Sequence, residues 1–291
     1  MHVFLTGGTG YIGAAVAGAL RRAGHEVSGL ARSAEAQQKL RTAGVRPVPG
    51  SLRDLPALER AARAADGVIH TASTNDADAG TADAAAVATM LSALAGSGKP
   101  FVYTSGVWVH GDSGGRVLDE NTPLNPAAIV AWRPAVEQAV LEAAARGVRA
   151  IVIRPGVVYG HGGGLPGMLV QSARQGGAAR FVGEGGNHWP VVDVEDLAVL
   201  YVLALERAPA GTLLLAVTES QPLAEIARAA SEGAGGGGAT TAWPIAEARQ
   251  SIGPLADALA LDQRASGARA RQLLDWQARA PGILETLRSG K

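Results

Sequence analysis

The first half of the chain alternates short apolar runs with amphipathic, alanine-rich segments. The apolar runs are continuous rather than alternating, which is typical of strands buried on both faces of a sheet. They predict strands at residues 2–6, 26–31, 45–49, 67–72, 100–105 and 148–154. The segments between them predict helices at residues 11–23, 34–43, 55–65, 81–96 and 134–146. This rhythm predicts an α/β fold, a doubly wound parallel sheet with helices on both faces.

The rhythm breaks after about residue 160, where two glycine-rich stretches predict loops, and it returns with a helix at 194–207 and a strand at 212–217. We therefore predict a first domain over 1–160 and a smaller second domain mainly over 161–291, with 191–217 returning to the first sheet. Within the second domain, the sequence predicts a flexible low-complexity loop and then a largely helical tail, at 232–241 and 244–289.

Composition removes several classes of function. The 291 residues include 26 Lys and Arg and 26 Asp and Glu, so the net charge is zero and nucleic acid is not the expected partner. The chain has no cysteine, which excludes disulfides, thiolate catalysis and cysteine-ligated metal. No apolar run is long enough to span a membrane, and the N-terminal segment lacks the pattern of a signal peptide. We expect a cytoplasmic protein that acts on a small molecule.

The segment TGGTGYIG at residues 6–13 follows the first predicted strand and precedes the first predicted helix. Its glycines, Gly7, Gly10 and Gly13, allow a tight turn and a close approach of the backbone to a pyrophosphate at the helix N-terminus. A glycine pattern alone is weak, but this one has the required strand–turn–helix context. It predicts a dinucleotide-binding site.

The end of the second predicted strand indicates which dinucleotide is bound. NAD-binding chains usually carry an acidic residue there for the ribose 2′-hydroxyl. This chain has Arg32 and Ser33 instead. Arginine binds a 2′-phosphate through charge-assisted hydrogen bonds, so the sequence favours NADP(H) over NAD. The alternative is that Arg32 is simply an exposed side chain at a strand end.

Five segments, in order, resemble the extended or atypical branch of the short-chain dehydrogenase/reductase superfamily, which includes epimerases and dehydratases. They are TGGTGYIG, GSLRD (50–54), VYTSG, RPGVVYG (154–160) and VVDVEDLA (191–198). The resemblance implies an NAD(P)-binding Rossmann domain, which Arg32 favours as NADP-binding, a variable substrate domain, and often a homodimer formed through helices 81–96 and 134–146. It implies cofactor contacts from Thr6, Gly7, Gly10, Tyr11, Ile12, Gly13, Arg32, Ser33, Ser51, Leu52, Thr71, Ala72, Ser73, Thr104, Arg133, Pro155, Gly156 and Val158. It implies substrate contacts from Ser105, Gly106, Val107, Trp108, Tyr159, His188 and Trp189.

The superfamily transfers its proton with a Tyr-x-x-x-Lys motif, which this chain lacks: no tyrosine has a lysine four residues after it. Aligned through the helix that carries Glu137, the lysine position falls on Arg133 and the tyrosine position on Ile129. Arginine can still donate to ribose hydroxyls, although it cannot itself titrate. Alternatively, Arg133 is a surface residue just before Pro134, the first residue of a helix.

Other candidates for catalysis are less specific. Ser105 ends a central strand and could polarise a substrate oxygen or satisfy its own turn, while Asp83 stands where the superfamily has an asparagine or is a helix-start acid. His161 and His188, like His110, could donate a proton or could simply be solvated. The histidine spacing does not predict a metal site.

Together these features predict an NADP-dependent oxidoreductase of a small to medium carbonyl or alcohol compound, with Ser105, Arg133, His161, His188 and Asp83 as catalytic candidates. Two alternatives remain. One is an NADP-binding redox sensor without turnover, which fits the missing tyrosine. The other is a sugar-nucleotide epimerase or dehydratase, which needs a proton-shuttling residue and a phosphate-binding set that the sequence does not display.

Overall fold

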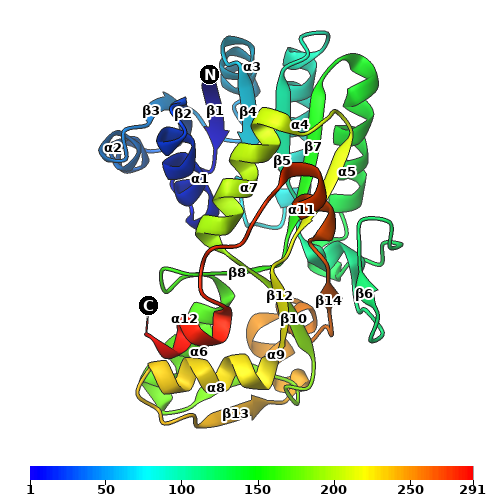
Figure 1. Cartoon of the computed structure of the whole chain (residues 1–291). Helices are drawn as coiled ribbons and strands as arrows, with labels where there is room; N and C mark the ends of the chain where they lie inside the picture. Colours follow the sequence, from blue (N-terminus) through cyan, green and yellow to red (C-terminus); the bar gives the residue numbers. More distant parts are fainter. Residues whose placement is uncertain (291) are drawn as a thin grey trace.

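A seven-stranded parallel sheet lies at the centre of the computed structural model, which describes residues 1–290 (Figure 1). The strand order is β11-β7-β5-β4-β1-β2-β3, with every neighbouring pair parallel. The strands are β1 (His2–Thr6), β2 (Glu26–Ala31), β3 (Arg46–Pro49), β4 (Gly67–His70), β5 (Pro100–Thr104), β7 (Arg149–Pro155) and β11 (Thr212–Ala216). The predicted doubly wound α/β fold is therefore confirmed.

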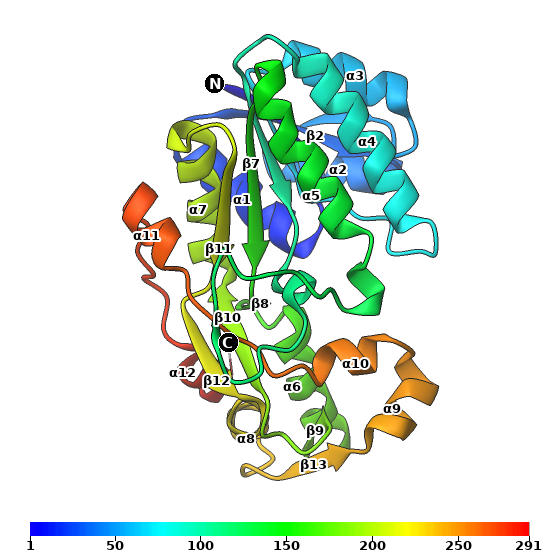
Figure 2. The same ribbon diagram turned by 90° about the vertical axis from the view of Figure 1, so that its right-hand side faces the viewer.

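Helices cover both faces of this sheet (Figure 2). One face packs on α1 (Tyr11–Arg22), α2 (Ala34–Thr42), α7 (Val194–Arg207) and α11 (Ala268–Leu274). The other packs on α3 (Leu55–Ala64), α4 (Ala79–Leu94) and α5 (Arg133–Glu142). Side-chain caps begin three of these helices, because Ser33, Asp54 and Asp193 each accept a hydrogen bond from a backbone N–H of the first turn.

The second domain has its own apolar core and three small sheets. Its strands are β6 (Val117–Leu118), β8 (Val157–Tyr159), β9 (Ala179–Val182), β10 (His188–Asp193), β12 (Glu219–Pro222), β13 (Thr240–Trp243) and β14 (Arg264–Ala265). Its helices are α6 (Gly164–Gly176), α8 (Leu223–Gly233), α9 (Ile245–Ile252), α10 (Leu255–Leu259) and α12 (Ile283–Arg288). Strand β10 lies between β8 and β12, parallel to the first and antiparallel to the second.

The boundary between the domains differs in detail from the predicted one. Residues 157–159 and 191–193 belong to the three-stranded sheet β12-β10-β8. The chain therefore packs on the large sheet again only at α7 and rejoins it at β11. The C-terminal segment also packs against the first domain. Trp276 is buried in the core of that domain and donates from its indole nitrogen to the carbonyl of Asp196. The predicted loop at 232–241 is shorter in the structure, because α8 extends into its first residues and β13 begins within its last ones. Local patterns missed these features because long-range packing determines them.

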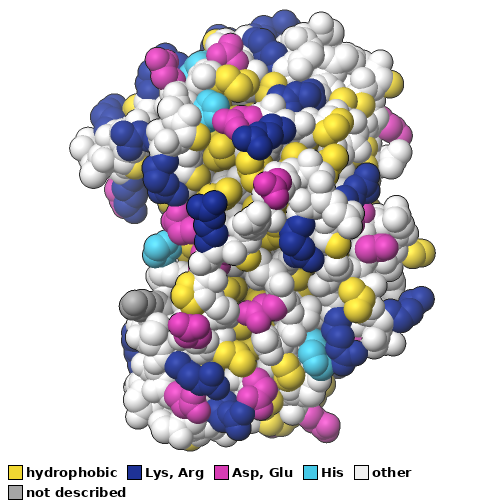
Figure 3. Space-filling view, viewed as in Figure 1, with side chains coloured by type: hydrophobic (Ala, Val, Ile, Leu, Met, Phe, Trp, Pro, Cys, Tyr) yellow, Lys and Arg dark blue, Asp and Glu magenta, His cyan; other side chains and the backbone are white. Residues whose placement is uncertain are grey.

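The visible surface in Figure 3 mixes basic and acidic side chains, without a field of one sign on this face. Among residues 1–290, no helix combines the length and the apolar character that crossing a bilayer requires.

Candidate functional site

The glycine-rich turn between β1 and α1 has the close packing that a dinucleotide site requires. Gly7 has φ of +77°, and a Cβ there would lie 2.7 Å from Thr71 Oγ1 and 2.8 Å from the backbone nitrogen of Ala72. A Cβ on Gly13 would lie 2.1 Å from the carbonyl oxygen of Gly7. Only glycine fits at these two positions, and the turn leaves the N-terminus of α1 open for a phosphate group.

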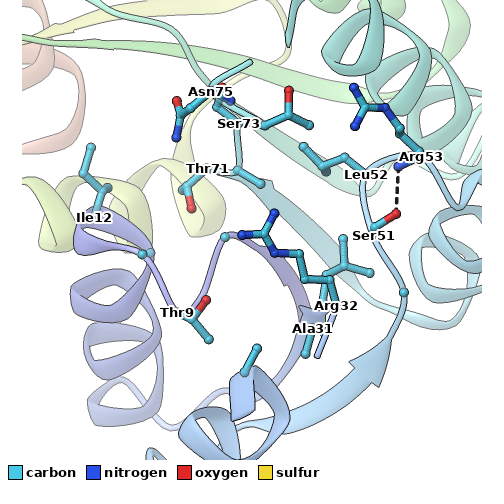
Figure 4. A pocket seen from close by; sticks show the side chains of 18 of the residues that line it. Thr9, Ile12, Ala31, Arg32, Ser51, Leu52, Arg53, Thr71, Ser73 and Asn75 are labelled. Atoms are coloured by element: carbon cyan, nitrogen blue, oxygen red, sulfur yellow. Dashed lines mark hydrogen bonds between the residues drawn. The ribbon is translucent and has the colours of Figure 1, made fainter. Parts of the chain in front are cut away.

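A cavity of about 490 Å³ lies over this turn, at the carboxyl ends of the strands (Figure 4). Eleven of the predicted cofactor residues line it: Gly7, Gly10, Tyr11, Ile12, Gly13, Arg32, Ser51, Leu52, Thr71, Ala72 and Ser73. The exposed Arg32 lies at its rim, and within residues 1–290 no carboxylate forms an ion pair with it. The volume of the cavity fits a dinucleotide, and the glycine turn and the Arg32 guanidinium fit its phosphate groups.

Seven predicted cofactor residues do not line this cavity, and two of them, Thr6 and Ser33, make protein contacts close to it. Thr6 is fully buried beneath it, where its hydroxyl lies 2.8 Å from Nδ1 of His70. Ser33 is the cap of α2 and accepts from the backbone N–H of Ala36. Their neighbours Gly7 and Arg32 do line the cavity.

The cavity also has lining residues that the sequence did not indicate. They are Thr9, Leu30, Ala31, Ala36, Gly50, Arg53, Thr74, Asn75 and Asp76. Arg53 lies 3.2 Å from Asp76 and 3.7 Å from Asp78, so an ion pair joins the loop after β3 to the loop after β4. The GSLRD segment contains Arg53, but the segment does not indicate that its partner is Asp76, more than twenty residues further along the chain.

A second cavity, of about 280 Å³, adjoins the first and is lined mostly by apolar groups. Its lining consists of Tyr11, Ile12, Ser105, Gly106, Val107, Trp108, Val130, Arg133, Pro155, Gly156, Val157, Val158, Gly164 and Leu165. Tyr11 and Ile12 line both cavities, so a ligand of the second lies against the end of the first. Four of the predicted substrate contacts, Ser105, Gly106, Val107 and Trp108, line this cavity.

Arg133 is held at the wall of this second cavity. Its Nη1 donates to the carbonyl of Thr104, 2.8 Å away, and its guanidinium lies 4.7 Å from the centre of the Trp132 ring. The remaining guanidinium hydrogens are left for a ligand. Thr104 itself does not line the cavity, because its hydroxyl lies 2.6 Å from that of Tyr201. The cofactor candidates Pro155, Gly156 and Val158 line this cavity rather than the larger one.

Ser105 directly follows β5, lines the same cavity as Arg133 and is 7% exposed. Its backbone N–H donates to the carbonyl of Ile153, but its Oγ has no hydrogen-bond partner within residues 1–290. A buried hydroxyl without a partner is costly, which marks Ser105 as a donor available to a ligand.

Comparison with known proteins identifies the family. The model of the NAD-dependent epimerase/dehydratase family matches residues 3–214. The chain belongs to this family. It is 35% identical over 292 residues to an uncharacterized protein of Schizosaccharomyces pombe, with 95% of each chain covered.

Two further similarities bear on this member of the epimerase/dehydratase family. It is 30% identical over 237 residues to the Stigmatella aurantiaca enzyme named 4-hydroxy-2-methyl-3-oxo-4-farnesyl-3,4-dihydroquinoline-1-oxide ketoreductase, covering 77% of this chain and 70% of that one. It also resembles the structure of a Thermus thermophilus UDP-glucose 4-epimerase in complex with NAD, with a TM-score of 0.81, 22% identity, and coverage of 99% and 97%. The latter likeness shows the fold. The predicted family is confirmed.

In this epimerase/dehydratase chain, Asp83 is not at the second cavity. It is 3% exposed and lies beneath the sheet ends, where Oδ1 is 2.9 Å from His70 Nε2 and Oδ2 accepts from the hydroxyl of Tyr103 at 2.8 Å. Nor is it a helix-start acid, since α4 begins at Ala79. Its contacts make it a structural residue that binds α4 to β4 and β5.

The structure also places the histidine candidates away from the second cavity. His161 has a side chain 67% exposed, and its Nε2 lies 3.1 Å from Glu195 of α7. His188 Nδ1 lies 3.0 Å from Asp262. His110 is buried, with Nε2 3.1 Å from Arg154 Nη1. All three have protein partners that direct them elsewhere.

Two more substrate candidates are structural. Trp189 is 5% exposed and donates from its indole nitrogen to the carbonyl of Leu259. Tyr159 donates to the carbonyl of Pro281, and it lines a separate cavity next to α6 and α12. The segment match placed both residues near a ligand, but their side chains face the core of the second domain.

Tyr11 connects the cofactor turn to the second domain of this epimerase/dehydratase chain. Its hydroxyl donates to the carbonyl of Gly160 at 2.7 Å, and a Cβ on Gly163 would lie 2.5 Å from its ring. Burial, and then the charge of Asp193, raise the pKa of Tyr11. Its proton is therefore strongly held.

A buried ion pair supports the wall of the second cavity. Glu137, one turn after Arg133 on α5, accepts from Nε of Arg154 at 3.1 Å and also from its Nη2. Both side chains are nearly inaccessible. Arg154 directly precedes Pro155 of the cavity wall, so the pair fixes α5 against the end of β7.

Proposed function

We propose that the protein is an NADP(H)-dependent oxidoreductase that reduces a small to medium, largely apolar carbonyl compound. The junction of the two cavities at Tyr11 and Ile12 carries the proposal, because it brings an organic molecule against the end of a dinucleotide site. A nicotinamide dinucleotide, when bound, supplies the hydride.

Arg32 supports NADP(H) in preference to NAD(H). It lines the dinucleotide cavity, and no carboxylate of the described part of the chain forms an ion pair with it, so its guanidinium is left for a 2′-phosphate. No acidic residue stands directly after β2, where one would bind a ribose 2′-hydroxyl and repel a phosphate. A charge-assisted hydrogen bond to a charged group is worth about 1.5–3 kcal/mol, enough to discriminate the two cofactors.

The second cavity supports an apolar carbonyl substrate. Its walls are valine, isoleucine, leucine, proline and tryptophan side chains, and Arg133 is the one charged residue among the described residues of its lining. The ketoreductase relative from Stigmatella aurantiaca is named for a ketone that carries a farnesyl group, which is consistent with an apolar substrate. A sugar nucleotide, with its two phosphates and many hydroxyls, would be poorly satisfied by this lining.

The residues of the chain take the following roles in the proposal. Arg133 orients the nicotinamide ribose or the substrate oxygen through its free guanidinium hydrogens, and Ser105 donates to the substrate oxygen. The proton comes from water, since no histidine of residues 1–290 lines the cavity. Positioned donors for a developing oxyanion are often the largest catalytic contribution.

The test is a titration of the purified protein with NADPH and with NADH, followed by nicotinamide fluorescence. It is followed by a carbonyl panel with the preferred cofactor. We expect NADPH to bind at least about tenfold more tightly than NADH, the effect of about 1.4 kcal/mol. Equal binding would remove Arg32 from the proposal, and binding of neither would refute it.

A second candidate, an NADP-binding redox sensor, is favoured by one observation. Among the described residues that line the second cavity, no side chain is a ready proton donor. A sensor would bind NADPH tightly and turn over no member of the carbonyl panel. Turnover therefore separates the two candidates.

A further inference from the structure

The lining of the second cavity contains hydrogen-bond donors for an oxygen anion but, among residues 1–290, no group that readily releases a proton. The polar side chains of this lining are Tyr11, Ser105, Trp108 and Arg133, with no carboxylic acid, lysine or histidine beside them. Arg133 is permanently charged and cannot act as an acid. Tyr11 is donating to the Gly160 carbonyl, and its pKa is raised. The site is equipped to hold an anion and not to neutralise it.

This imbalance restricts the substrates that can be reduced. Hydride addition to the carbonyl carbon of an isolated ketone produces an alkoxide, a strong base that needs a proton as it forms. A positioned acid contributes about 10²–10⁴-fold to such a step. Hydride addition to the β-carbon of a conjugated enone instead produces an enolate, whose charge is delocalised and whose oxygen is a weaker base. Donors alone can hold that anion until water protonates it.

We infer that the protein catalyses conjugate reduction of apolar α,β-unsaturated ketones. The inference rests on the proposed function and specifies its substrate class and its reacting carbon. Ser105 and Arg133 hold the enolate oxygen, the first through a buried hydroxyl without a partner in the described chain and the second through guanidinium hydrogens left free by Thr104.

The chemistry balances without a further reactant. The β-carbon of the substrate gains a C–H bond with the electron pair taken from the dihydronicotinamide C–H bond, which breaks. The π electrons of the C=C bond move to form the enolate, and its α-carbon takes a proton from water. One NADPH is oxidised, and the product is the saturated ketone.

Matched pairs of substrates test the inference. Cyclohex-2-enone is compared with cyclohexanone, and 4-phenylbut-3-en-2-one with 4-phenylbutan-2-one, each with NADPH carrying deuterium at C4. We expect saturated ketone labelled at the β-carbon, and turnover of each enone about 10²-fold faster than that of its saturated partner.

The outcomes separate the inference from the proposed function. An allylic alcohol product, or equal reduction of the saturated partners, overturns the inference and leaves the reductase proposal standing. No turnover of any pair by protein that binds NADPH overturns both.

Binding of a phenol to the free protein gives an independent readout. The phenolate of 4-nitrophenol absorbs in the visible, so a titration reports the pKa of the bound phenol. Two donors around its oxygen should lower that pKa by about one unit relative to the free phenol. Ser105→Ala and Arg133→Leu should each reduce the shift.

Ser231→Ala is the matched control. Ser231 is also fully buried with an Oγ that has no partner within residues 1–290, but it lies on α8 in the second domain, away from the cavity. Its removal should leave the phenol shift unchanged. A bound phenol whose pKa is unchanged or raised in the wild-type protein overturns the assignment of Ser105 and Arg133 as oxyanion donors.

Discussion

Arg133 donates from Nη1 to the backbone carbonyl of Thr104 across 2.8 Å, which joins the start of α5 to the carboxyl end of β5. The bond leaves the guanidinium at the wall of the second cavity, beside Ser105. The residue that stands at the lysine position of the superfamily motif is therefore not a solvated surface arginine. Its planar group is fixed by one hydrogen bond and by the Trp132 ring.

Replacing Arg133 with alanine should lower turnover by about 10²–10³-fold, the usual cost of removing one oxyanion donor. Arg133→Lys should recover only part of the loss, because lysine keeps the charge but not the planar fork. Steady-state kinetics with the enone substrate, together with an NADPH titration, measure both effects. Gln138→Ala, an exposed position on the same helix, serves as the control. Unchanged turnover and NADPH affinity in Arg133→Ala would refute the role.

Replacing Arg32 with alanine should weaken NADPH binding by about 10–100-fold, the range expected from losing a charge-assisted hydrogen bond. NADH binding should not change, because NADH lacks the 2′-phosphate. Fluorescence titrations of both cofactors provide the comparison. Arg41→Ala removes another exposed arginine near the far end of α2 and should affect neither cofactor. A parallel loss for NADH and NADPH would show that Arg32 contributes general charge and not phosphate recognition.

The large sheet could be predicted from the sequence because its signals are local. Each strand is a continuous apolar run, and each helix between strands has its own amphipathic pattern. The glycine turn could be predicted for the same reason, since Gly7 and Gly13 make their close contacts within one strand–turn–helix unit and with the adjacent β4 end. These elements therefore follow from residues near one another in the chain.

The candidate site was harder to predict because side-chain direction depends on distant partners. His161 and His188 lie next to recognisable motifs, but Glu195 and Asp262 draw their rings away from the cavity. Ile129, the position aligned with the catalytic tyrosine, is not part of the cavity lining, whereas the next residue, Val130, is. Both residues belong to a short 3-10 helix, η2 (Ala128–Val130). Because its three residues are all apolar, the sequence does not indicate which of them faces the cavity.

Breaking the buried Glu137–Arg154 ion pair should destabilise the folded protein strongly. Leaving one member of a buried ion pair unpaired costs about 3–5 kcal/mol, whereas an apolar pair of similar volume is often tolerated. We therefore expect Glu137→Leu or Arg154→Met alone to lower the free energy of unfolding by that amount, and the double variant to recover most of it. Urea denaturation of the four proteins measures the coupling. Strictly additive losses would show that each side chain acts alone.

We also expect a homodimer through α4 and α5. The exposed positions of α4 carry the small residues Thr81, Ala84, Ala88 and Ser92, which would let two helices approach closely. Ala88→Arg should convert the dimer to a monomer in light scattering after gel filtration. Ala239→Arg, at an exposed position in the second domain, is the control for added charge. A wild-type monomer at micromolar concentration would contradict the expectation.

His110 should make stability depend on pH. Its Nε2 accepts from the Arg154 guanidinium, so the folded protein holds a neutral ring. Burial first, and then the charge of Arg154, lower the pKa of His110 to about 4, against opposing contributions from Asp119 and the Thr122 backbone. In the unfolded chain the pKa returns to about 6.5. Between these values the unfolded state binds a proton that the folded state does not.

The sign follows from that difference. The stabilisation is fully present above pH 6.5 and is lost as the pH falls toward 4, because protons then favour the unfolded chain. It amounts to at most about 3 kcal/mol, from 1.36 kcal/mol per pKa unit. We expect the unfolding free energy of His110→Asn to fall less steeply than that of the wild type over this window, in urea denaturation at a series of pH values. His161→Asn, at an exposed ring, should follow the wild-type curve. If His110→Asn and the wild type lose stability in parallel, the neutral buried ring is not the source of the pH dependence.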